Sequence, residues 1–395
     1  MTTLTGIIQW PQAAEARVRR LEGGRIVHGE NDPLIPEDIR QQYPLRPGLE
    51  VTVEIAQRKR RRRGKGRPSL RTVVESVLAI EGGPPEAWAD RPQFEDLTSV
   101  DPAPRISLEY PGCPAACRLI DLFCPIGRGQ RGLIVSPPKA GKTTLLKDIA
   151  TGVLRNHPEI HLIALLVDER PEEVTDFRRT LLPAPGSDPA QWDRPWDPAR
   201  VQLIASSNDH DVERHIDVSL TTMERCRRMV EAGKHVVVIL DSLTRLGRAF
   251  NRSQKHASSG RTLTGGIDSR ALEMPRQIFG SARNTEEAGS LTILATCLVD
   301  TGSRGDQVIF EEFKGAGNME LILDRKIAER RLFPAINLAA SGTRKEDLLM
   351  SEQELATMTA LRRRLINMPP PQQVEQLLAA LNRFRDNAAL VGMQS

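Results

Sequence analysis

The sequence has few aromatic side chains and no long apolar run. Aromatic residues make up 4% of the 395 residues, so a surface that stacks on nucleic-acid bases would have to rely on a handful of side chains. No stretch approaches the ~20 consecutive apolar residues of a membrane-spanning helix. The chain also does not begin with a charged region followed by an apolar block, the pattern of a secretory signal. These absences predict a cytoplasmic protein without a membrane partner.

Cysteine is scarce as well. The five cysteines are an odd number in a long chain, which excludes a dense disulfide framework and is typical of a reducing cytosol. Cys113, Cys117 and Cys124 lie close together in the sequence, but no fourth ligand follows at the spacing of a zinc site. We therefore expect separate packed or exposed thiols here rather than a metal centre.

Acidic residues are missing from one short, strongly basic stretch. The net charge of the whole chain is only +4, yet nine Lys and Arg and no acid stand between Arg58 and Arg71. A run this dense favours a polyanionic partner over a merely solvated loop. We expect a basic loop over residues 57–71. The residues of this loop that we expect to contact the polyanion are Arg58, Arg60, Arg61 and Arg62.

Residues 1–82, which contain this loop, are typical of a small β domain. Val51, Val53 and Ile55 alternate as one face of a strand, and a second apolar stretch follows at 73–80. The length and the number of strands fit a five-stranded barrel of the oligonucleotide-binding (OB) kind. The aromatic side chains that could stack on bases are Trp10, Tyr43 and Trp88.

Residues 83–118 are rich in proline, glycine and acids. This composition favours an extended connector over a packed element. The sequence therefore predicts an OB-like domain at 1–82, a linker at 83–118 and a second domain at 119–395.

One stretch of the second domain predicts a phosphate-binding loop. An apolar strand at 133–135 is followed by a tight loop and by a helix over about 142–154. Gly141 would let the backbone approach a phosphate, and the first N–H groups of the helix would point at it. Lys142 would add a positive charge, and the Thr143 hydroxyl could ligate Mg²⁺. Because Ser136 replaces the usual first glycine, the prediction depends on the strand and helix around the loop.

Two further apolar strands end in carboxylates. The strand at 160–167 leads into Glu169, and the strand at 236–240 leads into Asp241. Ligands bind at the carboxyl ends of strands in an open α/β sheet. Asp241 would hold Mg²⁺ through water, and Glu169 would orient or deprotonate the attacking water. Between these strands, the proline-rich stretch 182–200 predicts a surface insertion.

Two glycine-rich loops and a helical tail complete the second domain. The loops at 258–268 and 310–318 each carry a single basic residue, Arg261 and Lys314. Contacts to a second polyanion and ordinary exposed turns are both compatible with this spacing. From residue 351 the apolar residues recur at helical spacing, interrupted at 369–371, which predicts two packing helices.

The sequence motifs of the second domain, taken in order, resemble those of the Rho transcription termination factor family, whose members are ring-forming RNA-dependent ATPases. The strings that carry the resemblance lie at 125–132, 137–143 (Pro-Pro-Lys-Ala-Gly-Lys-Thr), 168–175, 240–245, 263–266, 311–320 and 341–346. The resemblance implies an α/β protein with an OB-like β-barrel followed by a RecA-like P-loop ATPase domain whose sheet is mostly parallel. It also implies ATP and Mg²⁺ as cofactors, single-stranded RNA as partner, and a hexameric ring. RNA polymerase is a further candidate partner.

The resemblance also implies roles for individual residues. The residues expected to bind the nucleotide are Lys139, Ala140, Gly141, Lys142, Thr143, Thr144 and Phe333. Of these, Phe333 would stack on adenine. Metal binding falls to Thr143 and Asp241. The catalytic residues would be Glu169, Arg245 and Arg344, the last reaching into the adjacent subunit. RNA in the central channel would contact Arg261, Thr262, Thr264, Gly265, Gly266, Lys314 and Gly315.

The amino-terminal third departs from the family pattern in two ways. Strand-like sequence begins near Leu4, so we expect no helical subdomain ahead of the barrel. The family's aromatic strand appears here as 15–21, with Arg17, Arg19 and Arg20, so charge would replace stacking. Two alternatives to an RNA translocase that terminates transcription therefore stay open. One is a ring ATPase that remodels RNA without being a general terminator, and the other is a protein-translocating ATPase of the same superfamily.

Overall fold

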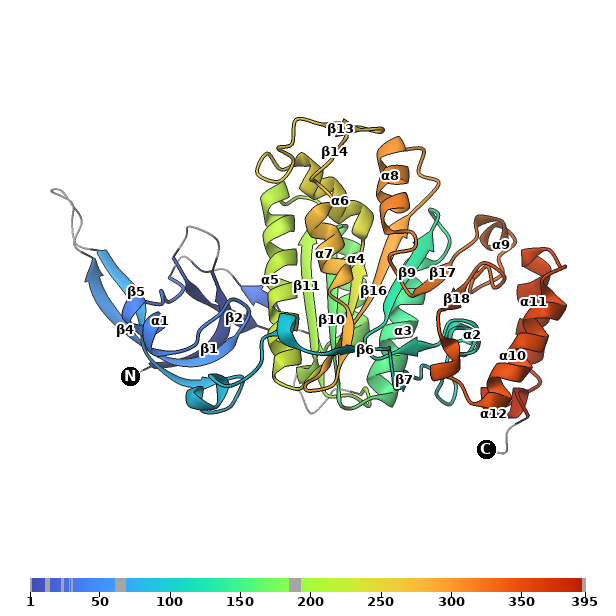
Figure 1. The fold of residues 1–395 in the computed structure, drawn as a ribbon, viewed down its shortest axis with the longest axis horizontal. Helices are drawn as coiled ribbons and strands as arrows, with labels where there is room; N and C mark the ends of the chain where they lie inside the picture. Colours follow the sequence, from blue (N-terminus) through green and yellow to red (C-terminus); the bar gives the residue numbers. More distant parts are fainter. Residues whose placement is uncertain are drawn as a thin grey trace.

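The computed structural model describes residues 2–10, 15–22, 25–27, 29, 31–60, 69–184 and 193–392. Figure 1 shows the amino-terminal β domain at one end of the long axis, the α/β domain in the middle and the last helices at the other end. Within the described residues, no helix combines the length and the apolar character needed to cross a membrane.

The amino-terminal domain is a closed antiparallel sheet with the strand order β3-β2-β1-β4-β5. Leu34 bridges both Arg17 on β2 and Val73 on the edge strand β5, which joins the two sides of the sheet as a barrel requires. The inward residues of the alternating pattern, among them Val51 and Val53, are buried. The predicted barrel is confirmed. Its elements are β1 (Thr2–Gln9), β2 (Arg17–Glu22), β3 (Arg25–Val27), α1 (Glu37–Gln42), β4 (Glu50–Arg60) and β5 (Ser69–Ile80).

The basic stretch is strand at both of its ends, 57–60 and 69–71, so the prediction of a loop over 57–71 was wrong there. The ladder between β4 and β5 continues to Arg60 and Ser69 and pairs Arg58 with Arg71. Backbone hydrogen bonds extend the hairpin regardless of the charge that the exposed side chains carry. Residues 61–68, which include the predicted RNA contacts Arg61 and Arg62, lie outside the described residues, as does the side chain of Arg60.

Two of the three aromatic candidates for base stacking remain accessible. Trp88, in the short helix η1 (Pro85–Trp88), is buried in the barrel core, so its assignment as a stacking residue was wrong. Trp10 is partly exposed and carries the guanidinium of Arg40 4.7 Å above its ring.

The connector is packed against the α/β domain, contrary to the expectation from its composition. Phe94 in η2 (Phe94–Asp96) is 1% exposed and lies under the guanidinium of Arg283, 4.5 Å away. The strand β6 (Ser99–Val100) joins the main sheet through β15 (Arg283–Thr285). A few apolar side chains spaced along 94–108 are enough to hold the segment down. The remaining elements are β7 (Arg105–Ile106), which pairs with β8 (Ile126–Gly127), and α2 (Ala115–Phe123).

The second domain is built on a sheet with the order β11-β10-β12-β16-β9-β17-β18, in which all strands but β18 run parallel. The strands predicted from apolar runs are confirmed, and β10 and β12 are buried over almost their whole length because helices cover both faces. The strands are β9 (Arg131–Ser136), β10 (Ile160–Glu169), β11 (Val201–Ser207), β12 (His235–Asp241), β16 (Ser290–Leu298), β17 (Met319–Ile322) and β18 (Gly342–Thr343).

Helices and one hairpin complete the domain. The helices are α3 (Lys142–Asn156), α4 (Pro171–Leu181), α5 (Val212–Glu231), α6 (Leu243–Arg252), α7 (Glu273–Gly280), α8 (Arg304–Phe313) and α9 (Arg325–Glu329), and the hairpin is β13 (Thr262–Leu263) with β14 (Ile267–Asp268). The predicted tail helices are confirmed as α10 (Glu352–Leu365) and α11 (Pro370–Leu381), followed by α12 (Asn387–Leu390). Pro370 begins α11 because a first-turn proline lacks only an N–H that would be unpaired there.

The predicted insertion at 182–200 is described only in part. Residues 185–192 lie outside the described residues. Trp196 is buried and its indole N–H donates to the Leu181 carbonyl at 3.2 Å, so this part is not a surface element. The short helix η4 (Pro198–Arg200) follows it.

The barrel docks on α5 through a buried ionic cluster. Arg225 is 1% exposed and pairs with Glu81 and, at 3.3 Å, with Glu50 of the barrel. At the end of the same helix Glu231 accepts from Arg46 at 2.7 Å. These pairs are desolvated, so they tie the orientation of the barrel to the helix that lies along the main sheet.

Candidate nucleotide site

The phosphate loop joins the end of β9 to the start of α3. Lys139 and Gly141 both have positive φ, 65° and 87°, and Gly141 stands at the N-cap of α3. A left-handed conformation at this position favours glycine, and a Cβ here would lie 3.3 Å from the ring of Phe333. The first N–H groups of α3 and the positive end of its dipole therefore face the space beyond β9, as an anion site requires.

Lys142 lies between two carboxylates. Its Nζ donates to the carboxylate of Asp241 and lies 3.7 Å from Oε2 of Glu169. The order β10-β12-β16-β9 brings these residues together because the two acids end adjacent strands, with Asp241 on β12 two places and Glu169 on β10 three places from β9. Leu166 of β10 pairs with Asp241 of β12. Glu169 therefore lies three residues beyond the position on β10 that is opposite Asp241.

Glu169 is held in a desolvated position. Its side chain is 1% exposed, and Oε2 has no hydrogen-bond partner within the described residues. Burial, together with the nearby negative charge of Asp241, raises the pKa of Glu169 against the opposing pull of Lys142 and Arg245. Arg245 donates to Oε1 at 2.9 Å and also to the backbone oxygen of Asp168. The site thus holds a positioned carboxylate with enhanced proton affinity.

A cavity of about 510 Å³ adjoins the phosphate loop. Ala140 and Thr144 line it from one side, Ala115 and Ala116 from α2, and Phe333 covers it from the loop after α9. Phe333 remains 46% exposed, so one face of its ring is accessible. A mostly apolar hollow beside a phosphate loop, with an available aromatic face, suits a purine base.

The oxygen donors near the loop suit Mg²⁺. Thr143 Oγ1 donates to Glu173 at 3.0 Å, the Asp241 carboxylate lies opposite, and Glu169 Oε2 is a buried acceptor. Mg²⁺ bound to a nucleotide uses one or two protein oxygens together with phosphates and water. No cluster of three or more His, Cys, Asp or Glu that could hold a metal occurs in the described residues, and an ion bound in this way does not need one.

Comparison with known proteins assigns this domain. The nucleotide-binding domain of the ATP synthase alpha/beta family matches residues 116–343. The transcription termination factor Rho of Aquifex aeolicus is 46% identical over 357 residues, which cover 90% of this chain and 77% of the relative. The chain belongs to the Rho family. The relative of the same name from Mycobacterium tuberculosis is also 46% identical, and the matched part covers 91% of this chain and 56% of its own length.

Solved structures support the same fold at greater distance. A type III secretion system ATPase from pathogenic bacteria superimposes with a TM-score of 0.59 at 22% identity, covering 79% of this chain and 81% of its own. The ATP synthase subunit NeqB superimposes with a TM-score of 0.54 at 16% identity. The match covers 74% of this chain and 66% of the NeqB chain. These likenesses establish the RecA-like architecture alone. The resemblance read from the motifs and the predicted fold class are confirmed.

In this Rho-family chain, Arg344 lies at the far end of the sheet from its own phosphate loop. It follows β18, whose Thr343 pairs with Met319, and Met319 pairs with Gly132 at the start of β9. The phosphate loop begins after Ser136, four residues along, or roughly 13 Å at a strand rise of about 3.3 Å. Arg344 is exposed and lines a different hollow, beside Asn318. It does not meet Lys142 within one subunit.

The two predicted RNA loops lie at opposite ends of α8. In the β13–β14 hairpin residues 261–266 are exposed, and Gly265 packs against the backbone of Arg304 at the first turn of α8. Lys314 and Gly315 are exposed just after its last turn, about 15 Å away for ten residues. Figure 1 shows the hairpin at the top of the domain, next to α8. The structure thus places both loops along one exposed helix.

Two polar neighbours of the site were not predicted. Thr296 of β16 donates to Asp241 at 2.8 Å, and Glu173 accepts from Thr143. Thr296 stands near the carboxyl end of a buried apolar strand, the same signal that singled out Glu169 and Asp241. Behind the site His215, 5% exposed on α5, lies 3.8 Å from Asp168, a contact that nothing in the sequence spacing indicated.

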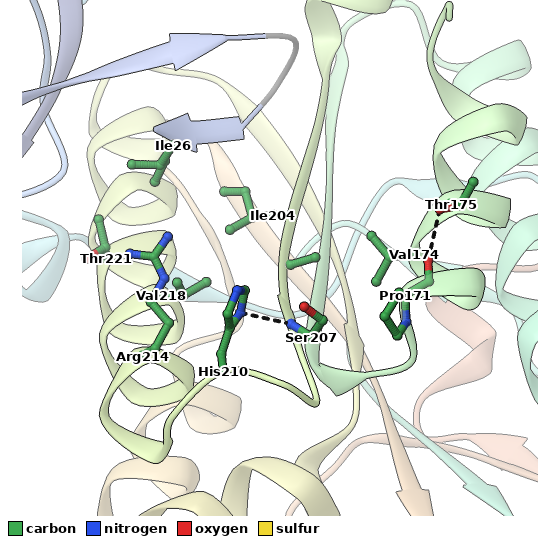
Figure 2. Close-up of a pocket in the computed structure, with 11 residues that line it drawn as sticks. Ile26, Pro171, Val174, Thr175, Ile204, Ser207, His210, Arg214, Val218 and Thr221 are labelled. Carbon is green, nitrogen blue, oxygen red and sulfur yellow. Dashed lines mark hydrogen bonds between the residues drawn. The ribbon is translucent and has the colours of Figure 1, made fainter. Parts of the chain in front are cut away.

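A second cavity, of about 350 Å³, lies between the barrel and the α/β domain. Ile26 of β3, Ile204 of β11, and His210 and Arg214 around the start of α5 line it (Figure 2). His210 accepts a hydrogen bond from the backbone of Ser207. None of its lining residues is acidic, and none belongs to the phosphate loop. This cavity is therefore distinct from the candidate nucleotide site.

Proposed function

We propose that this Rho-family chain is an ATP-driven translocase on single-stranded RNA that terminates transcription. The observation that carries the proposal is the convergence of Lys142, Asp241 and Glu169 beside a glycine-ended phosphate loop. A charge-bearing loop, an acid for the metal and a positioned base are the parts that phosphoryl transfer to water requires.

Each group has a task in hydrolysis. Lys142 and the first N–H groups of α3 bind the outer phosphates, while Thr143 and Asp241 hold Mg²⁺, which neutralises phosphate charge when bound. Glu169 orients the attacking water and accepts its proton, since its raised pKa makes it a better base than an exposed glutamate. Arg245 keeps that carboxylate in place and assists at the γ-phosphate. Phe333 stacks on the adenine.

The position of Arg344 supports a ring of identical subunits. An exposed arginine that cannot reach its own phosphate loop is available to a neighbour's γ-phosphate, where a guanidinium stabilises the transition state. We propose a hexamer in the cytoplasm, with RNA polymerase as a partner during termination.

RNA binding is assigned to two surfaces. The loops around α8, with Arg261 and Lys314, would contact RNA that the ring encloses. The hairpin of β4 and β5, with Arg58 opposite Arg71, would attract the phosphate backbone. Because few aromatic faces accompany this charge, the affinity should depend steeply on salt and little on base identity.

The test is the ATPase rate of the purified protein with poly(C), poly(U), poly(A) or no RNA, each over a range of salt concentrations. We expect stimulation by every single-stranded RNA and a steep loss of stimulation with salt. Equal hydrolysis with and without RNA would contradict the translocase assignment.

A second candidate is a ring ATPase that remodels RNA without being a general terminator. It is favoured by β2, where Arg19 is engaged within the barrel by Asp32 and Gln9, both at 2.7 Å. Neither an aromatic ring nor an available cation stands at that position. Pyrimidine-selective stimulation in the same homopolymer series would count against this candidate.

A further inference from the structure

The cavity of about 350 Å³ between the barrel and the α/β domain has the size and the lining of a small-molecule site. Such sites commonly have volumes of about 300–1,000 Å³ and combine apolar walls with a few polar groups. The apolar walls come from both domains, with Ile26 from β3 and with the buried Ile204 and Val218 from β11 and α5. Ile26 also packs against the apolar core of the α/β domain. The cavity is therefore bounded by a contact between the two domains.

Arg214 gives this cavity a positive charge. It belongs to the first turn of α5, and Figure 2 shows it among the side chains that line the cavity. Within the residues that the structure describes, its guanidinium forms no ion pair and no hydrogen bond. The other three arginines of α5, Arg225, Arg227 and Arg228, each pair with a glutamate. Arg214 therefore differs from them in having a guanidinium that is available to a ligand.

The acids nearest to Arg214 in the sequence are engaged elsewhere. Asp211 caps α5 by accepting from the backbone N–H of Arg214 at 2.7 Å. Glu213 accepts from a serine hydroxyl after α6 at 2.6 Å, and Asp217 accepts from Nε2 of Gln9 at 2.7 Å. A half-buried guanidinium without an acidic partner favours an anionic ligand, because a charge removed from water is costly unless it is paired.

His210 adds a hydrogen-bond donor to the cavity. Its Nδ1 accepts from the backbone N–H of Ser207 at 3.2 Å, so the neutral ring carries its proton on Nε2. No carboxylate is among the residues that line the cavity in the described part of the chain. A guanidinium and an imidazole N–H beside an apolar wall suit one carboxylate or phosphate group on an apolar body.

One wall of the cavity adjoins the strand end that carries Glu169. Ser207 pairs with Glu169 in the ladder between β10 and β11, and the N–H of Asn208 donates to the Glu169 carbonyl at 3.1 Å. Pro171 follows Glu169 by two residues. Ser207 and Pro171 both line the cavity. A ligand here therefore contacts both domains and the segment that holds the base, without entering the nucleotide site.

We propose that this cavity binds a small organic anion. The carboxylate or phosphate group of the ligand lies at Arg214 and His210, and its apolar body packs against Ile26, Ile204 and Val218. The ligand bridges the barrel and the α/β domain, so it stabilises their docked arrangement. The site is separate from the nucleotide site and does not depend on ATP hydrolysis.

The experiment is isothermal titration calorimetry of the full chain, with its nucleotide site filled by Mg²⁺ and a non-hydrolysable ATP analogue. Phenyl phosphate and phenylacetate carry both parts of the ligand, whereas inorganic phosphate carries only the anion and benzyl alcohol only the apolar body. We expect saturable binding of at least one of the two organic anions, about tenfold tighter than inorganic phosphate or benzyl alcohol. The tighter of the two identifies the anionic group. Saturable binding of neither would overturn the proposal.

Arg214→Gln should weaken binding of the organic anion by about tenfold, because it removes the charge-assisted hydrogen bonds. Ile26→Ala should weaken it by about fivefold, because the barrel then offers less apolar surface. Arg179→Gln, at an exposed position of α4 outside the cavity, is the matched control and should bind like the wild type. Thermal unfolding without ligand checks that each variant is folded. Unchanged affinity in a folded Arg214→Gln variant would overturn the proposal.

Lys142→Ala, titrated without the analogue, separates this cavity from the nucleotide site. It should bind the organic anion like the wild type, since Lys142 does not line the cavity. Loss of binding in this variant would place the probe at the phosphate loop and would overturn the proposal. Failure of the wild type to bind the ATP analogue would contradict the proposed function instead, and the Lys142→Ala titration would still decide the cavity.

Discussion

Arg245 and Glu169 form a hydrogen-bonded ion pair at the junction of two strands, with Nη2 2.9 Å from Oε1. The same guanidinium donates to the backbone oxygen of Asp168. Arg245 belongs to α6, which follows β12, whereas Glu169 ends β10. One side chain therefore ties the tips of adjacent strands and sets the position of the carboxylate before any substrate contact.

Replacing Glu169 with glutamine should remove the base without removing the hydrogen bond to Arg245. We expect kcat to fall by about 10²–10⁴-fold. Because the pKa of Glu169 is raised above 4.5 by burial and by Asp241, the wild-type rate should fall as the pH drops through a midpoint above 4.5. The variant should lack this acidic limb. The measurement is a pH profile of RNA-stimulated hydrolysis.

Glu172→Gln is the matched control, since Glu172 is exposed in the first turn of α4. It should keep both the rate and the acidic limb. A Glu169→Gln variant with an unchanged pH profile would show that another group accepts the proton.

Arg344→Ala should abolish hydrolysis, by about 10³-fold or more, while ATP affinity changes little. Lys142→Ala should lose both hydrolysis and ATP affinity. If the guanidinium acts in a neighbouring subunit, mixing the two inactive variants should restore activity, since interfaces that join an intact phosphate loop to an intact Arg344 will form.

The mixing experiment is read as ATPase rate against the fraction of each variant. Arg363→Ala, an exposed arginine of α10, should behave like the wild type throughout. No recovery at any ratio would contradict action between subunits.

Removing a basic residue from either loop beside α8 should weaken RNA binding without weakening ATP binding. Arg261 and Lys314 are both exposed. Each alanine variant should reduce the slope of log affinity against log salt concentration by about 1 if the residue neutralises a phosphate. Arg325→Ala, whose side chain is exposed and paired with Glu329, is the control. An unchanged slope in both loop variants would contradict the assignment of these loops.

Glu81→Gln should loosen the barrel from α5, because it leaves the buried Arg225 with Glu50 as its one acidic partner among the described residues. We expect a loss of about 3 kcal/mol in the free energy of unfolding, measured by urea denaturation at pH 7. Burial opposes ionisation of Glu81, but attraction to Arg225 prevails and its pKa is lowered. The stabilisation is therefore present above about pH 4.5 and is lost as the pH falls through the lowered pKa.

The difference between the wild type and Glu81→Gln should accordingly shrink in strong acid. Glu75→Gln, at an exposed position of β5, should have the same free energy of unfolding as the wild type both at pH 7 and in strong acid. Equal stability of the Glu81 variant at pH 7 would show that Arg225 does not depend on this partner.

The strands and the phosphate loop that the sequence predicted correctly are all marked by short-range sequence patterns. Apolar runs of the right length marked β9, β10, β12 and β16, and the loop before α3 was marked by Gly141 and Lys142 next to such a run. The basic charge led to the wrong prediction of a loop at both ends of 57–71, where strand pairing extends to Arg60 and Ser69. The composition led to the wrong prediction of an extended connector at 83–118, where a few buried apolar side chains such as Phe94 hold the proline-rich segment against the domain.

Residue types and their order along the chain were sufficient to determine the family, the two kinds of domain and the acids at the strand tips, because these follow from short-range patterns. Only the tertiary structure decided that Arg344 and Lys142 lie apart and that Arg245 holds Glu169. These relationships depend on strand order and helix packing. Both are set by burial summed over the whole domain rather than by neighbouring residues.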